Sequence, residues 1–162
     1  MEKKSVYIET SVISYLTSRP SRNLVVAAWQ SETIRWWDRR RDDFELCISP
    51  LVVEEMRGGD PDAANRRLAA VAGIPLLDIR DEIFELAEAL VQPSAIPRKA
   101  FDDALHISLA AFYGIDFLLT WNCRHMDNAE IKPVVRSTCE TCGYNCPEIC
   151  TPSELMGDRC DA

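Results

Sequence analysis

Residues 5–11 read Ser-Val-Tyr-Ile-Glu-Thr-Ser and carry the signal that decides the fold. The apolar run Val6-Tyr7-Ile8 predicts a short buried strand. Thr10 and Ser11 are residue types that cap the start of a helix. Glu9 stands between the strand and the helix, where an acid is hard to explain by structure alone. The stretch therefore predicts a strand-to-helix turn with a carboxylate at the carboxyl end of the strand.

Acidic or amide residues occupy comparable places in three further stretches. They are Glu54 and Glu55 within 49–56, Asp102 and Asp103 at the start of 101–106, and Asn122 after the apolar run 118–119. Apolar strand patterns alternate with helical patterns along the chain, which predicts an α/β fold with a central parallel sheet covered on both faces. In such sheets ligands bind at the carboxyl ends of the strands. We therefore expect these side chains to converge on one point.

The remaining elements follow from periodicity and from Pro, Gly and capping residues. Strands are expected at 5–8, 44–48, 76–79, 117–120 and, less strongly patterned, 148–151. Helices are expected after Thr10, at 23–40, from 50 to the Gly58-Gly59 pair, and at 61–71, 81–90, 101–113 and 133–142. A chain of 162 residues is long enough for one domain with its own core. We assign that domain to residues 1–155, with a cysteine-rich segment at 139–160.

The charge balance is acidic, with a formal net charge of −8. This argues at first against nucleic acid as a partner, because binding to phosphate is largely electrostatic. The charge is uneven, however, since residues 1–44 carry +2 and the rest of the chain −10. Four arginines (Arg35, Arg39, Arg40 and Arg41) beside Trp36 and Trp37 form the best basic and aromatic patch. We interpret it first as the solvated end of an amphipathic helix.

The chain has no apolar run long enough to span a bilayer and no signal-peptide pattern, so we expect a soluble, cytoplasmic protein. Its seven cysteines are then expected to be reduced. Cys47 and Cys123 fall in predicted core elements, and the other five crowd the end of the chain: Cys139, Cys142, Cys146, Cys150 and Cys160. Four thiols within 139–150 are enough in number for zinc. They lack the diagnostic paired CxxC arrangement, so free thiols or disulfides are favoured and metal binding stays an alternative.

The four polar stretches together resemble the PIN-domain ribonucleases, most closely the VapC-like toxins of type II toxin–antitoxin modules. The matching residues are Glu9-Thr10-Ser11, Ser49-Pro50 with Glu55-Met56, Asp103-Ala104-Leu105-His106-Ile107, and Thr120-Trp121-Asn122-Cys123-Arg124-His125. The resemblance covers about residues 4–155, and its end at Thr151-Pro152-Ser153-Glu154-Leu155 is similar to the family's usual ending. Each motif alone is weak, whereas their order and spacing are fairly specific. The resemblance implies a three-layer α/β/α sandwich.

By this resemblance, Glu9 takes the family's first acidic position, where Asp is more common, and Glu55 the second. Asp103 takes the third, and Asn122 stands where many members have a fourth Asp. These four are the candidate catalytic residues, with Glu9 and Asp103 as metal ligands and Glu55 and Asn122 acting directly or through water. The implied activity is hydrolysis of RNA by Mg²⁺ or Mn²⁺, which lowers the pKa of a bound water. The implied partners are RNA, a small antitoxin and a second copy of the chain.

Neighbouring residues have simpler interpretations. Glu54 is expected to be a solvated helix residue and Asp102 a charge that favours a helix N-terminus. His106, three residues after Asp103, is expected to be a satisfied, partly buried histidine. For Arg124 and His125 a structural role and an approach to substrate phosphate are equally open. Trp121 is expected to pack in the core.

Two other functions fit the same chain. A degenerate PIN domain that binds RNA or protein without cutting is suggested by Glu9, Asn122 and the acidic balance. A redox- or metal-responsive regulator is suggested by the cysteine-rich segment. Metal-dependent cleavage of RNA separates the nuclease from the first alternative, and metal analysis of the protein with and without residues 139–162 separates it from the second.

Overall fold

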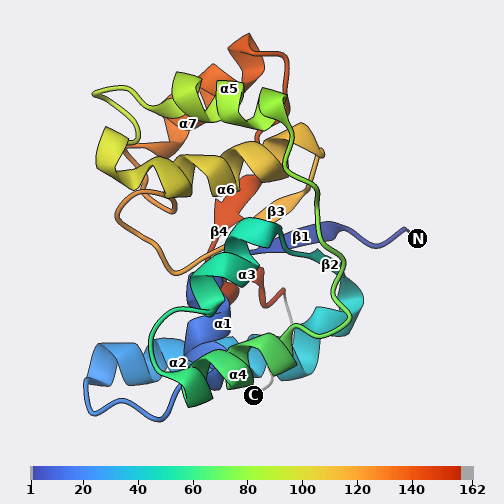
Figure 1. Cartoon of the computed structure of the whole chain (residues 1–162), viewed down its shortest axis with the longest axis vertical. Coiled ribbons are helices and arrows are strands. Elements are labelled where there is room, and N and C mark those ends of the chain that lie inside the picture. The colour runs from blue at the N-terminus through green and yellow to red at the C-terminus, as the bar shows by residue number, and fades with distance from the viewer. Residues whose placement is uncertain (1, 158–162) are drawn as a thin grey trace.

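Four short strands form one parallel sheet at the centre of this computed structural model, which describes residues 2–157. They are β1 (Ser5–Ile8), β2 (Glu45–Cys47), β3 (Phe117–Leu119) and β4 (Glu148–Cys150), in the order β2-β1-β3-β4 (Figure 1). Val6 lies opposite Leu46 on one side and Phe117 on the other. After β1 the chain adds β2 on one side of β1, and later it adds β3 on the opposite side. The point where the strand order reverses therefore lies between β1 and β3.

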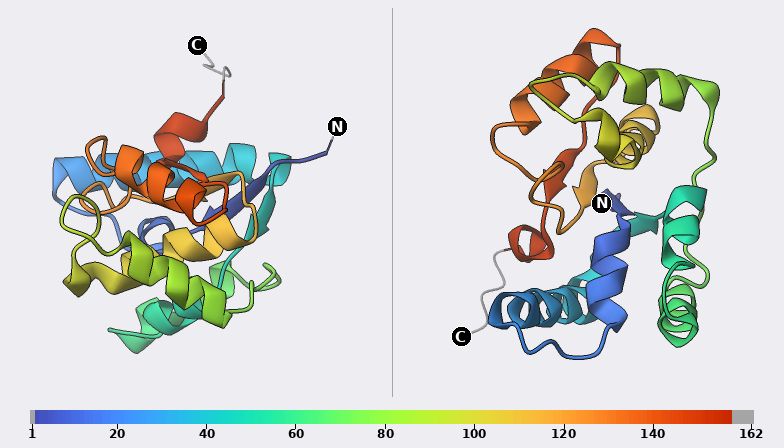
Figure 2. Two further views of the ribbon diagram at one scale, coloured as in Figure 1. Left: turned by 90° about the horizontal axis from the view of Figure 1, so that it is seen from above. Right: turned by 60° about the vertical axis from the view of Figure 1, so that its left-hand side comes forward.

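Helices cover both faces of this sheet. They are α1 (Thr10–Thr17), α2 (Leu24–Arg40), α3 (Pro50–Met56), α4 (Pro61–Ala70), α5 (Asp81–Leu90), α6 (Phe101–Phe112) and α7 (Lys132–Thr141), with short 3-10 turns η1 (Arg41–Asp43), η2 (Arg98–Ala100) and η3 (Pro152–Leu155). In Figures 1 and 2, α5, α6 and α7 lie on one side of the sheet, and α1, α2 and α4 lie on the other. The predicted α/β fold, a three-layer α/β/α sandwich with a central parallel sheet, is confirmed.

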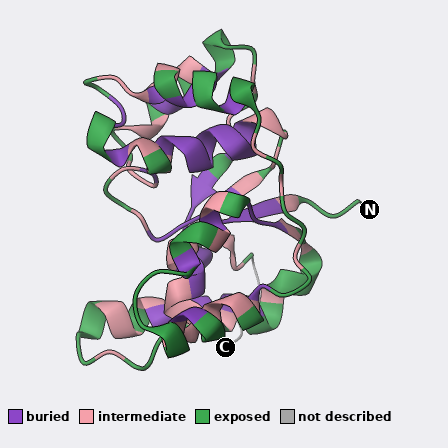
Figure 3. Ribbon diagram, viewed as in Figure 1, coloured by how far each residue is buried: buried purple, intermediate pink, exposed green. Residues whose placement is uncertain are grey.

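The core follows β1 and α6 through the middle of the molecule (Figure 3). The side chains of Val6, Tyr7 and Ile8 are fully buried because β1 is a central strand covered on both faces. Residues 104–111 of α6 are buried without interruption, as expected for a helix that is apolar on all sides. Asp103 and His106 are therefore carried by the most enclosed helix of the fold.

Helix boundaries follow the capping residues closely. The Asn23 side chain accepts hydrogen bonds from the backbone N–H groups of Val25 and Val26, and Ser49 caps α3 with Pro50 at the first helical position. One expected cap is wrong. The cap of α1 is Glu9, whose carboxylate accepts from the Ser11 N–H, and the helix already begins at Thr10.

The predicted strand at 76–79 is also wrong, because only one bridge forms there, between Ile48 and Leu76. The Ile48 N–H donates to the Pro75 carbonyl over 3.0 Å, and the Leu77 N–H donates to the Ile48 carbonyl over 2.8 Å. The chain then turns away from β2, and the Asp78 carbonyl accepts from the Tyr113 hydroxyl instead. Leu76 is half exposed, so this apolar residue is not buried as a residue of a central strand would be.

The arginine and tryptophan patch is a solvated helix end only in part, because Arg39 and Arg41 are exposed but the rest is not. Trp36 and Trp37 are buried against the core rather than displayed. Arg40 forms an ion pair with Asp43 at 3.0 Å and donates to the Met156 carbonyl. In the described residues, no helix combines the length and apolar character needed to cross a bilayer.

Candidate functional site

The site forms around the reversal of strand order, where the chain leaves β1 and β3. Glu9 follows β1, and its N–H donates to the carbonyl of Leu119, the last residue of β3, over 3.0 Å. Thr120 and Asn122 follow β3 directly. Ligands of open α/β sheets bind in this position. The two strand ends therefore bring Glu9 and Asn122 to one place, as the sequence predicted.

Glu9 is an enclosed carboxylate, with only 5% of the residue exposed. Its oxygens accept hydrogen bonds from the Ser11 N–H and, over 3.0 Å, from the Thr120 hydroxyl. Burial raises the pKa of Glu9, against the opposing effects of His106 and of these hydrogen bonds. Glu9 thus caps α1 in addition to any chemical role. This cap explains by structure why an acid stands at this position, which the sequence alone did not.

Glu55 points from α3 toward α6, where it meets His106. Its Oε1 contacts the His106 Nε2 at 2.6 Å and accepts from the Thr10 hydroxyl over 2.8 Å. Burial would raise the pKa of Glu55, but hydrogen bonding and the charge of His106, with help from Thr10, lower it overall. About a third of the Glu55 side chain stays exposed, so this acid is held in a fixed position while remaining open to a ligand.

His106 is the buried centre of the arrangement, with 1% exposure. Its Nδ1 contacts the Tyr7 hydroxyl at 2.7 Å, and that hydroxyl contacts the Ser49 hydroxyl at 2.8 Å. Burial would lower the pKa of His106, but the hydrogen bond to Glu55 and the charges of Glu9, Glu55 and Asp103 raise it overall. The expectation of a satisfied histidine is confirmed, and its burial is complete rather than partial.

Asp103 and Asn122 are connected through His125. The His125 Nδ1 lies 3.1 Å from the Asp103 Oδ2. The side-chain oxygen of Asn122 accepts hydrogen bonds from the backbone N–H groups of Arg124 and His125. The backbone N–H of Asn122 donates to the Thr120 hydroxyl. Asn122 therefore shapes the turn that places His125 against Asp103.

The structure brings all four predicted site residues into one neighbourhood. Hydrogen bonds lead from Glu9 through Thr120 and Asn122 to His125 and Asp103. Glu55 joins the same neighbourhood through His106, on which the charges of all three carboxylates act. Side chains from β1, α3, α6 and the turn after β3 thus converge at the carboxyl end of the sheet.

The donor types suit a hard divalent cation. Glu9 and Asp103 offer carboxylate oxygens, which Mg²⁺ and Mn²⁺ prefer. Within residues 2–157, no three Asp, Glu, His or Cys side chains are grouped in a way that could hold a metal ion. Mg²⁺ usually binds through only one or two carboxylates, with waters and substrate phosphate as the other ligands. The carboxylates of Glu9, Glu55 and Asp103 all lie close enough to act on His106, and the oxygen donors of Glu9 and Asp103 fit such an ion in type.

The neighbours with simpler interpretations behave as expected. Glu54 is exposed beside Arg57, and Asp102 is exposed at the start of α6. The Trp121 indole is buried, stacks on Trp29, and donates to the Thr33 hydroxyl over 2.7 Å. None of these side chains is part of the hydrogen-bond network described above.

Sequence reasoning gave no role to Tyr7 or Thr120, and it underrated His106. For Thr120 a signal existed, because it is a hydroxyl residue at the end of an apolar strand and two positions before Asn122. His106 had the signal of lying one helical turn after Asp103. Tyr7 had none, since it reads as one more core residue of β1.

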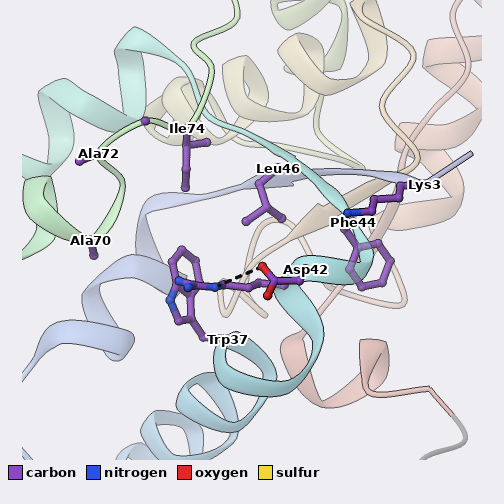
Figure 4. A pocket seen from close by; sticks show the side chains of 10 residues that line it. Lys3, Trp37, Asp42, Phe44, Leu46, Ala70, Ala72 and Ile74 are labelled. Atoms are coloured by element: carbon purple, nitrogen blue, oxygen red, sulfur yellow. Dashed lines mark ion pairs between the residues drawn. The ribbon is translucent and has the colours of Figure 1, made fainter.

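A separate cavity of about 360 Å³ lies at the other end of the sheet. Its lining includes Lys3, Trp37, Arg41, Phe44, Leu46 and Ile74. Figure 4 shows Trp37, Leu46 and Ile74 among the lining side chains. Arg41 forms an ion pair with Asp42 that spans 3.7 Å. Lys3 and Phe44 precede β1 and β2, so this cavity is at the amino ends of the strands and includes no predicted site residue.

No protein-family model and no curated protein matches this chain.

Proposed function

We propose that this protein is a metal-dependent endoribonuclease of the PIN-domain kind, which hydrolyses RNA phosphodiester bonds with Mg²⁺ or Mn²⁺. The observation that carries the proposal is the convergence of Glu9, Glu55 and Asp103 on His106 beside the reversal of strand order. Burial raises the pKa of Glu9, whereas the hydrogen bond and charge of His106 outweigh burial and lower the pKa of Glu55. Groups with perturbed pKa values are concentrated at functional sites. The candidate ligands and the topology both favour a cation site that meets a phosphate.

The residues of this chain have distinct parts in the proposed reaction. Glu9 and Asp103 would hold the ion, which would supply Lewis-acid chemistry toward the phosphate and an activated water. Glu55 is fixed by Thr10 and His106 and stays partly exposed, so it would orient the attacking water. His125 orients Asp103, and Asn122 fixes the turn that carries His125. No protein nucleophile is needed.

The proposal extends to partners. A small antitoxin and a second copy of this chain would need an apolar surface, and the buried tryptophans of α2 do not provide one. The exposed apolar side chains of α2 are Leu24, Val25 and Ile34. Such exposed apolar groups mark contact surfaces when they are contiguous. We propose a cytoplasmic location, where cysteines are reduced unless an oxidant reacts with them.

The test is cleavage of a pool of structured RNAs in Mn²⁺, Mg²⁺ or EDTA. We expect cleavage with either metal, none with EDTA, and a loss of at least about a hundredfold in Asp103→Asn, because a carboxylate ligand becomes a neutral amide. Asp102→Asn is the matched control, since this neighbouring acid is exposed, and it should cleave like the wild type. Full activity of both Asp103→Asn and Glu9→Gln would refute the site assignment.

A second candidate is a PIN-like domain that binds RNA or protein without cutting it. The observation that favours it is the engagement of Asn122, whose side-chain oxygen is taken up by two backbone N–H groups. Glu9 is likewise occupied as the cap of α1. RNA binding by folded protein, with no cleavage in either metal, would select this candidate over the nuclease.

A further inference from the structure

The end of α7 folds back on itself and brings two cysteines together. Cys139 is in the last turn of α7 and is fully buried. The chain then reverses at Gly143, whose φ of +88° suits glycine, and the Tyr144 N–H donates to the Cys139 carbonyl over 2.9 Å. Cys146, seven residues after Cys139, returns to the same place and is half-buried against the core.

The two thiols form a hydrogen-bonded pair. Their side chains are hydrogen-bonded to each other, and Arg136, one turn earlier on α7, adds a positive charge near Cys146. This hydrogen bond, together with Arg136, lowers the pKa of Cys146 in spite of burial, and the same contact raises the pKa of Cys139. A cysteine beside a hydrogen-bond donor and a cation has thiolate character and is reactive.

The other described cysteines have different surroundings. Burial raises the pKa of Cys47 and of Cys150 to about 12, so both behave as inert core residues. Cys123 and Cys142 are exposed. Cys160 lies outside the described residues. Cys146 is thus distinguished by a donor thiol in contact with it and by partial access from solvent.

We propose that Cys139 and Cys146 form a redox pair that closes into a disulfide on reaction with a hydroperoxide. The Cys146 thiolate attacks the peroxide, the O–O bond breaks, and a sulfenic acid forms on Cys146 while the peroxide is reduced to water or an alcohol. The Cys139 sulfur then attacks the sulfenic sulfur, the S–S bond forms, and hydroxide leaves with the Cys139 proton as water. The two thiols together supply two electrons.

The enclosed position of Cys139 favours this outcome over further oxidation. The two side chains are already hydrogen-bonded to each other, so the second step needs only a local adjustment. A closed bridge would tie the last turn of α7 to the segment that enters β4. This inference is independent of the nuclease proposal, because it uses none of the four site residues.

The experiment uses the full chain, oxidised with hydrogen peroxide, blocked with an alkylating reagent and digested without reduction. A protease that cuts after glutamate separates Cys139, in peptide 131–140, from Cys142 and Cys146, in peptide 141–148. We expect these two peptides to be joined, with the loss of two hydrogens, in the wild type and in Cys142→Ser. Cys142→Ser is the matched control because Cys142 is on the same peptide but exposed.

The variant Cys146→Ser should lose the joined peptides and leave Cys139 available to alkylation after unfolding. Its thermal unfolding is compared with that of the wild type to show that the fold is intact. Joined peptides at wild-type yield in Cys146→Ser would mean that Cys142 is the partner, and would overturn the proposal. Free thiols in the wild type after peroxide, or bridges only between separate chains, would overturn it as well.

Discussion

Replacing His106 with leucine tests the network that joins the three carboxylates. Leucine fills most of the space of the imidazole, but it removes the 2.6 Å contact with Glu55 and the 2.7 Å contact with Tyr7. A hydrogen bond to a charged group contributes about 1.5–3 kcal/mol and a neutral one about 1 kcal/mol. A third of Glu55 is exposed, so we take the lower part of the first range. We expect His106→Leu to lower the free energy of unfolding by about 3 kcal/mol at about pH 6.

The loss should shrink as the pH rises. The folded state raises the pKa of His106 above its ordinary value of 6.5. The stabilisation from its charge is therefore fully present below pH 6.5 and is lost as the pH rises through the folded pKa. The variant lacks this titration. At about pH 9 the difference should be smaller, because the neutral imidazole keeps its contacts with Tyr7 and Glu55 but has lost the charge that strengthens the second of them.

Urea unfolding followed by tryptophan fluorescence at the two pH values measures this difference. His125→Leu is the control, because His125 and Asp103 are 3.1 Å apart but each side chain is about a fifth exposed. We expect it to cost about 1 kcal/mol, the ordinary contribution of one hydrogen bond. The reasoning is refuted if His106→Leu costs no more than His125→Leu, or if its cost is the same at both pH values.

Three further predictions concern Glu9, the α2 cap and the metal. Burial raises the pKa of Glu9, so the neutral Glu9→Gln should have a free energy of unfolding within about 1 kcal/mol of the wild type at about pH 7. The same variant should lose metal-dependent cleavage. A larger loss of stability in urea unfolding contradicts this. Asn23→Ala removes the acceptor for two N–H groups of α2 and should cost about 1 kcal/mol by the same method, whereas no cost would contradict the cap. Mn²⁺ at about a hundredfold excess over its Kd should add about 2.7 kcal/mol, which raises Tm by about 5–10 °C. Asp103→Asn should abolish the shift and Asp102→Asn should keep it, so equal shifts in the two variants would contradict the site.

Most of the fold was predictable because it follows from local signals. Apolar runs such as Val6-Tyr7-Ile8 are buried strands, and caps such as Asn23 begin helices where expected. The predicted strand at 76–79 does not form, although its apolar pattern is that of a strand. Beyond the bridge between Ile48 and Leu76 it has no partner strand among residues 2–157. Strand pairing is a long-range property that a local pattern does not contain.

The closeness of the four candidate residues was predictable, but their hydrogen bonds were not. Strand ends and spacing predicted that Glu9, Glu55, Asp103 and Asn122 lie near one another, as the structure has them. The hydrogen bonds among them depend on which side chain of one element meets which of another, as Tyr7 of β1 meets His106 of α6. Sequence patterns place residues on faces and at ends of elements, whereas these contacts are fixed only when the layers pack.

The structure also changes the reason for expecting a metal. The sequence suggested that crowded carboxylates need a counter-charge, and His106 supplies one positive charge within the chain. Three acids act on that one histidine, and the pKa of Glu9 is still raised by burial. At Glu9, burial therefore outweighs the charge of His106 and the hydrogen bonds. A divalent ion there would let Glu9 ionise at lower pH, whereas a domain that only binds RNA can leave Glu9 protonated as the cap of α1. The ionisation of Glu9 thus separates the two candidate functions.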